Sequence, residues 1–95
     1  MQETNDYTRA GAAVALLKLD LGDTKASAVV RDCLNRRSDP QLRIITVRLI
    51  RSMGPSARVF IPDLQYLLSN SDLTIAAYSR GVLKELGSNA KAQSP

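Results

Sequence analysis

The sequence contains no histidine and no tryptophan, and it has one cysteine in 95 residues. Histidine is the commonest general base and a frequent zinc ligand, so its absence excludes Ser-His-Asp and Cys-His nucleophiles and the usual zinc sites. Cys33 has no second thiol with which to form an internal disulfide. No glycine-rich phosphate loop is present, and the acidic residues are scattered. We therefore expect a non-enzymatic protein without a cofactor or a metal ion.

Long hydrophobic runs are also missing. No apolar stretch approaches the roughly 20 residues that a membrane-spanning helix needs. The first six residues are polar and lack the basic-then-apolar pattern of a secretory signal. The formal net charge of +4 is modest and weakly favours acidic partners. These features predict a cytoplasmic protein without a membrane segment.

The sequence is rich in helix starts and stops, most clearly in the segment 39–54. The side chain of Asp39 can accept hydrogen bonds from the first turn, and Pro40 fits the first helical position. Gly54 tolerates the left-handed conformation that closes many helices. Between them, apolar residues recur at helical spacing on one side: Leu42, Ile45, Leu49, Ile50 and Met53. The segment therefore reads as one complete amphipathic helix.

Four further helices are predicted at about 5–20, 26–36, 57–69 and 73–86, separated by turns at 22–25, 37–39 and 70–72. Asn5 or Asp6 is expected to cap the first helix and Asp72 the last, and Pro62 either begins the regular part of the fourth or bends it. No segment alternates with period two, so the fold class is all-α. We expect a frayed N-terminus over 1–4, one helical domain over 5–87 and a disordered tail over 88–95.

The helices repeat along the chain. The shift that places Arg9 on Arg43 aligns the first two helices with the third and fourth: Leu16 with Ile50, Leu19 with Met53, Val30 with Leu64, Cys33 with Leu67 and Leu34 with Leu68. A shift one position shorter aligns the third helix with the fifth: Leu42 with Ile75, Leu49 with Val82, Ile50 with Leu83, Met53 with Leu86 and Gly54 with Gly87. Caps, stops and core positions match together, which predicts a repeated helical hairpin.

This pattern resembles the HEAT-repeat family. The segment 60–75 is similar to the family's helix-A-and-turn pattern, with Pro62 at the proline position, and Leu42-Arg43 matches the aliphatic–arginine pair that opens helix B. Three residues depart from the family pattern. Asn70 stands where the family usually has aspartate, Ala76 where it has arginine, and Asp20 where it has glycine. The resemblance implies a short right-handed, armadillo-like α-solenoid of antiparallel helix pairs, with about two and a half repeats and about five helices.

In this register the helices run B-A-B-A-B, and the first helix lacks an A partner. Its apolar residues lie on nearly every side: Ala12, Ala15, Leu16 and Leu19 on one, and Ala10, Val14, Leu17 and Leu21 on another. A helix that is apolar on every side is normally buried on every side. Either the chain is a piece of a longer solenoid, or a second molecule covers the first helix, as in a homodimer.

The resemblance also indicates where a partner would bind, because B helices line the concave surface of HEAT-like stacks. At the positions expected on this surface, the side chains change along the sequence from aliphatic to cationic: Val14, Leu17, Ile44, Arg48, Arg51, Arg80 and Lys84. One interpretation is an ordinary solvated face. The other is a groove for an acidic, partly apolar peptide or protein surface, which would make the chain a protein-interaction scaffold or assembly module.

Two further functions stay open at this point. Some HEAT-like proteins grip nucleic-acid phosphates with such arginines, but the small net charge and the 4% content of aromatic residues argue against it here. Assistance to a prosthetic group, as in HEAT-like bilin lyases, is implied by the resemblance alone.

Overall fold

The structure is a computed structural model that describes residues 5–70 and 72–87. Within these ranges it contains no β-strand, five α-helices and one 3-10 helix: α1 (Asp6–Leu19), α2 (Thr24–Leu34), α3 (Pro40–Arg51), η1 (Gly54–Phe60), α4 (Ile61–Asn70) and α5 (Leu73–Glu85). The prediction of an all-α fold with about five helices is confirmed. The expected frayed start at 1–4 and the expected tail at 88–95 lie outside the described residues.

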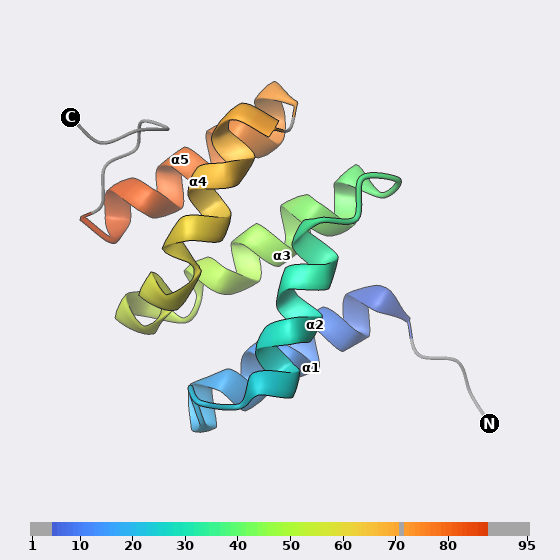
Figure 1. The fold of residues 1–95 in the computed structure, drawn as a ribbon, viewed down its shortest axis with the longest axis vertical. Coiled ribbons are helices and arrows are strands. Elements are labelled where there is room, and N and C mark those ends of the chain that lie inside the picture. The colour runs from blue at the N-terminus through green and yellow to red at the C-terminus, as the bar shows by residue number, and fades with distance from the viewer. Residues whose placement is uncertain (1–4, 71, 88–95) are drawn as a thin grey trace.

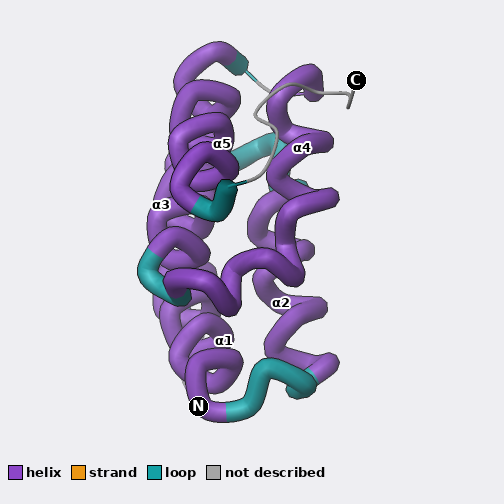
Figure 2. Tube along the Cα trace, turned by 90° about the vertical axis from the view of Figure 1, so that its left-hand side faces the viewer, coloured by secondary structure: helices purple, strands orange, loops and turns teal. Residues whose placement is uncertain are grey.

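The helices form two layers along the 49 Å long axis of the molecule (Figure 1). Figure 2 shows α1, α3 and α5 in one layer and α2 and α4 in the other. In the first layer α3 lies between α1 and α5 and packs against both, while α2 packs against α1 and α3 and α4 packs against α5. Each helix is therefore covered by its neighbours along the axis.

Short polar side chains begin four of the helices. The Oδ1 atoms of Asn5, Asp39 and Asp72 accept hydrogen bonds from first-turn N–H groups at 2.7, 3.0 and 2.9 Å, which confirms these predicted caps. Asp23 caps α2 in the same way, through Ala26 at 3.0 Å. The predicted start of this helix at 26 was two residues late, because Asp23 was assigned to a turn.

The segment 54–70 differs from the single helix predicted over 57–69. Gly54 has φ of +65°, the left-handed conformation expected of a residue that ends α3. The chain then forms η1, and α4 begins at Ile61 with Pro62 in its first turn. A proline there displaces no helical hydrogen bond, so Pro62 begins the regular helix rather than bending it.

The register predicted for the first helix was wrong by one residue. The buried residues of α1 are Ala10, Ala13, Val14 and Leu17, and they correspond in order to the buried residues Arg43, Thr46, Val47 and Ile50 of α3. The predicted shift aligns the buried residues of α2 with those of α4, and it aligns the cap Asn5 with the cap Asp39. The buried residues of α1, however, align with those of α3 at a shift that is one position shorter. One residue turns a helix face by about 100°. Leu16 and Leu19 are consequently 49% and 87% exposed instead of buried.

Ion pairs join neighbouring helices. Asp6 of α1 accepts from Arg9 at 2.9 Å and from Arg36, just beyond α2, at 2.8 Å. These hydrogen bonds, first from Arg9 and then from Arg36, hold the pKa of the Asp6 carboxyl below its ordinary value. Arg31 of α2 donates to Asp63 of α4 at 3.2 Å, and its Cζ lies 5.1 Å from the ring centroid of Phe60.

Two arginines donate to backbone carbonyls at the ends of neighbouring helices. Nε of Arg43 donates to the carbonyl of Leu34 at the end of α2, at 2.7 Å, and this arginine is buried with 5% exposure. Nη1 of Arg58 donates to the carbonyl of Leu86 after α5, at 2.6 Å. Both cations lie where the helix dipole and unpaired carbonyls favour positive charge.

We expect Arg43→Ala to lower the free energy of unfolding by about 1–3 kcal/mol, because it leaves the buried Leu34 carbonyl without a donor. Urea denaturation followed by circular dichroism measures the change. Arg37→Ala, at an exposed arginine, is the control and should change stability by less than about 0.5 kcal/mol. Equal effects of the two substitutions would contradict the role given to Arg43.

Asp6 predicts a pH dependence of stability. Because its folded-state pKa lies below the ordinary 3.8, ionised Asp6 stabilises the fold above that value, and the contribution is lost as the pH falls through the folded-state pKa. The difference in unfolding free energy between the wild-type chain and Asp6→Asn should be constant above about pH 5 and shrink below about pH 4. A difference that does not change with pH would show that the two arginines do not act on this carboxyl.

Candidate functional site

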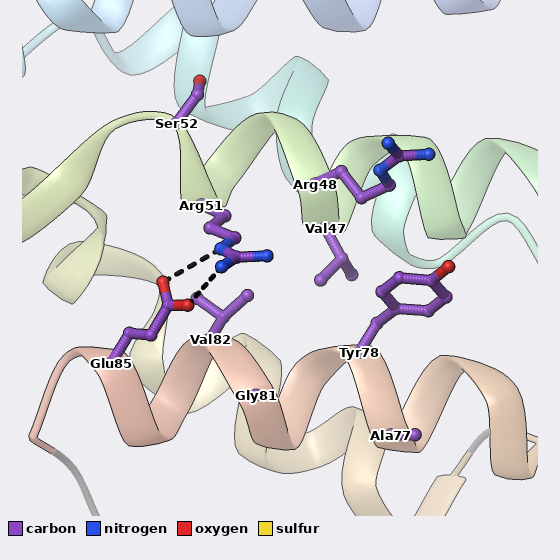
Figure 3. Close-up of a pocket in the computed structure, with 9 residues that line it drawn as sticks. All are labelled: Val47, Arg48, Arg51, Ser52, Ala77, Tyr78, Gly81, Val82 and Glu85. Atoms are coloured by element: carbon purple, nitrogen blue, oxygen red, sulfur yellow. Dashed lines mark hydrogen bonds and ion pairs between the residues drawn. The ribbon is translucent and has the colours of Figure 1, made fainter.

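A groove of about 510 Å³ lies between α3 and α5 (Figure 3). We call it the α3–α5 groove; its lining residues are Val47, Arg48 and Arg51 from α3, Ser52 just beyond α3, and Ala77, Tyr78, Gly81, Val82 and Glu85 from α5. Gly81 has no side chain, and a Cβ placed there would meet no atom within 4 Å. The groove is therefore open where Gly81 faces it.

The floor of the groove is apolar and its two ends are polar. Val47 and Val82 are buried and point toward each other between the two helices (Figure 3). Arg48 and Tyr78 stand at one end, and Arg51 lies with Glu85 at the other. Because Val47 and Val82 are 0% and 3% exposed, a ligand lying along the groove would contact mainly the exposed side chains of Ala77 and Tyr78, between two different polar ends.

The ion pair at one end uses two parallel contacts. Nε of Arg51 donates to Oε1 of Glu85 at 3.0 Å, and Nη2 of Arg51 lies 2.5 Å from Oε2. Both side chains are exposed, so the pair contributes little to stability. It occupies both carboxylate oxygens and balances the charge of Arg51, so an acidic ligand would gain less at Arg51 than at a guanidinium without a partner.

Arg48 is different, because its side chain takes part in no hydrogen bond or ion pair among residues 5–70 and 72–87. Its side chain is exposed, and its guanidinium lies on the same side of the groove as the Tyr78 hydroxyl (Figure 3). Two arginines and one glutamate leave one positive charge in the groove. A planar guanidinium is well suited to bind a carboxylate through two hydrogen bonds.

The structure brings together only part of the predicted partner-binding set. Arg48 and Arg51 line the groove, while Ile44 is half-buried and packs against the core. Arg80 and Lys84 are exposed on α5 but do not line the groove. Arg80 is two residues from Tyr78 and so lies about 200° around the helix from it.

Val14 and Leu17 correct the aliphatic part of the predicted surface. They are 2% and 1% exposed and belong to the main hydrophobic core. The one-residue error in the register of α1 placed these two side chains on the concave face. In the structure they fill the space between α1 and its neighbours, so no partner can reach them in this conformation.

Tyr78 and Glu85 are groove residues that the sequence reading missed. The sequence analysis gave Tyr78 no role and counted Glu85 among the scattered acidic residues. A signal for Glu85 was present, because Arg51 precedes it by about the length of one repeat. Positions one repeat apart lie side by side when successive helices of one layer are neighbours.

Other kinds of site find little support in the described residues. Cys33 is buried, and burial raises the pKa of its thiol, which keeps it protonated. No three acidic or cysteine side chains in residues 5–70 and 72–87 are grouped to hold a metal ion. None of the described helices combines the length and apolar character needed to cross a membrane.

No protein-family model, no curated protein and no solved structure matches this chain. The geometry of the α3–α5 groove is therefore the basis of the function proposed below.

Proposed function

We propose that this chain is a non-enzymatic protein-interaction module that binds an acidic, partly apolar peptide in the α3–α5 groove. The observation that carries the proposal is the guanidinium of Arg48, unpaired within the described part of the chain, beside the exposed apolar surface of Ala77 and the Tyr78 ring. Aliphatic side chains of a ligand would gain by leaving water at this exposed apolar surface. A ligand carboxylate next to them would pair with Arg48.

The two ends of the groove give the ligand a direction. Glu85 holds Arg51 and places negative charge at that end, so a second carboxylate there would be repelled. At the other end, Arg48 and the hydroxyl of Tyr78 both offer donors. An acidic residue of the ligand therefore binds at the Arg48 end, with aliphatic residues toward Gly81.

We further propose that the architecture is a short HEAT-like α-solenoid of about two and a half repeats. Its support is the placement of α1, α3 and α5 in one layer and of α2 and α4 in the other (Figure 2). Buried positions also recur from one helix of a layer to the next, as from Leu42 to Ile75 between α3 and α5 and from Val30 to Leu64 between α2 and α4. In such a stack the α3–α5 groove lies between two consecutive B helices.

Phosphate binding to nucleic acid through the same arginines is the less favoured function. Glu85 occupies Arg51 and adds a negative charge inside the groove. Nucleic-acid backbones need several cations that are free to replace counterions, whereas among the residues that line this groove Arg48 is the cation without a partner.

The test of the proposed function compares two substitutions that change the charge equally. Selection of a random peptide library on the wild-type chain should enrich peptides in which Asp or Glu adjoins aliphatic residues. Arg48→Glu should weaken binding of these peptides by about tenfold or more, because it places like charges together. Arg80→Glu, at an exposed arginine outside the groove, should leave binding unchanged. Fluorescence anisotropy with labelled peptides measures both affinities.

Two outcomes would contradict the proposal. Equal losses in Arg48→Glu and Arg80→Glu would mean that net charge, and not the groove, controls binding. Binding of a DNA duplex that weakens steeply as salt rises, without any enriched peptide, would favour the nucleic-acid function instead.

A further inference from the structure

A second groove, of about 360 Å³, lies between α1 and α2. Its apolar lining includes Ala12 and Leu16 of α1 and Val29 of α2, and Asp23 and Lys25 stand on its rim. Figure 1 shows α1 and α2 at one end of the long axis and α5 toward the other. We call this surface the α1–α2 end; it is separate from the α3–α5 groove and from the function proposed for it.

The repeat indicates that the α1–α2 end corresponds to apolar surface that is buried in the following helix pair. In the register of the buried residues, Leu16 of α1 corresponds to Leu49 of α3. Leu49 is partly buried against Ala10, Cys33 and Leu42, so α1 and α2 cover it. No described helix covers Leu16 in the same way, and half of its surface is exposed. Leu19, at the end of the same helix, is more exposed still.

The opposite end of the molecule is polar and does not match this surface. In the same register, Val47, which faces α5 in the α3–α5 groove, corresponds to Arg80, and Arg51 corresponds to Lys84. Arg80 and Lys84 are exposed and form no ion pair among the described residues. Head-to-tail stacking of two chains would place these cations on an apolar groove, which is unfavourable.

The rim of the α1–α2 end is complementary to itself. Asp23 and Lys25 carry opposite charges two residues apart, and neither forms an ion pair with a side chain in the described part of the chain. Asp23 uses one oxygen to cap α2, which leaves the other free. In a two-fold dimer, residue i of one chain meets residue j of the other and the reverse contact forms as well. Asp23 of each copy can therefore face Lys25 of the other.

We infer that two copies of this chain associate through their α1–α2 ends about a two-fold axis, with Ala12 and Leu16 at the centre and Asp23–Lys25 pairs at the rim. The end is small, because the shorter dimensions of the molecule are 29 and 17 Å. A standard interface buries about 800 Å² on each partner. The dimer is therefore weak and forms in a concentration-dependent way, with a dissociation constant of about micromolar or higher.

Sedimentation equilibrium of the 95-residue chain over a concentration series tests this inference. The wild-type mass should rise from that of one chain, 10.3 kDa, to that of two and no further. Leu16→Arg should raise the dissociation constant by about tenfold or more, because it puts a charge at the apolar centre. Leu73→Arg, at a leucine of α5 that is 89% exposed, is the matched control and should have no effect.

A second pair of variants tests the rim without changing the apolar centre. Lys25→Glu should weaken the dimer, and added salt should partly restore it, because salt screens the repulsion between the introduced glutamate and Asp23. Lys84→Glu makes the same charge change at α5 and should not alter association. Circular dichroism should show the same helicity for all four variants.

Three results would overturn the inference. The first is a wild-type chain that stays a single chain at the highest concentration. The second is evidence of head-to-tail contact. It would be either a mass that grows beyond two chains or a loss of association in Leu73→Arg equal to that in Leu16→Arg. The third is an undiminished dimer in both Leu16→Arg and Lys25→Glu, which would place the interface elsewhere.

Discussion

A short pair of helices cannot cover its own apolar surface, and this constraint governs the whole molecule. α3 satisfies it most completely, because it packs against α1, α2, α5 and η1. Its residues Leu42, Val47 and Ile50 are fully buried as a result. The two ends of the molecule satisfy the constraint in different ways, since α5 ends in polar side chains while the α1–α2 end keeps apolar ones. The proposed dimer supplies the missing cover and leaves the α3–α5 groove of each copy free.

Several arginines of this chain stabilise the fold. Arg43 holds the end of α2, Arg31 joins α2 to α4, and Arg36 joins the end of α2 to α1. Arg51 is held by Glu85. Within the described residues Arg48 is left unpaired in the α3–α5 groove. The difference between paired and unpaired arginines is the basis of the proposed function, and the net charge does not reveal it.

The sequence predicted well what depends on a single helix and predicted poorly what depends on how two helices meet. The caps Asn5, Asp39 and Asp72 were correct because a cap is a local hydrogen bond. The face of α1 was not, because its cap and its buried side recur in α3 at shifts that differ by one position.

The candidate site shows the same division. Periodicity put Arg48 and Arg51 about one helical turn apart on the same face of α3, and the resemblance to HEAT repeats indicated that a partner would bind to that face. Tyr78 and Glu85 were missed because contacts across two helices depend on their lateral spacing, which no periodicity within one helix records.

Amide hydrogen exchange tests the central claim, that the helices form a stack in which each is covered only by its neighbours. Such a stack should show the slowest exchange in the middle of α3, which is covered on both sides, and faster exchange in α1 and α5 at a protein concentration where the chain is monomeric. Equal protection of α1, α3 and α5 under these conditions would indicate five helices around one common centre and would contradict the account.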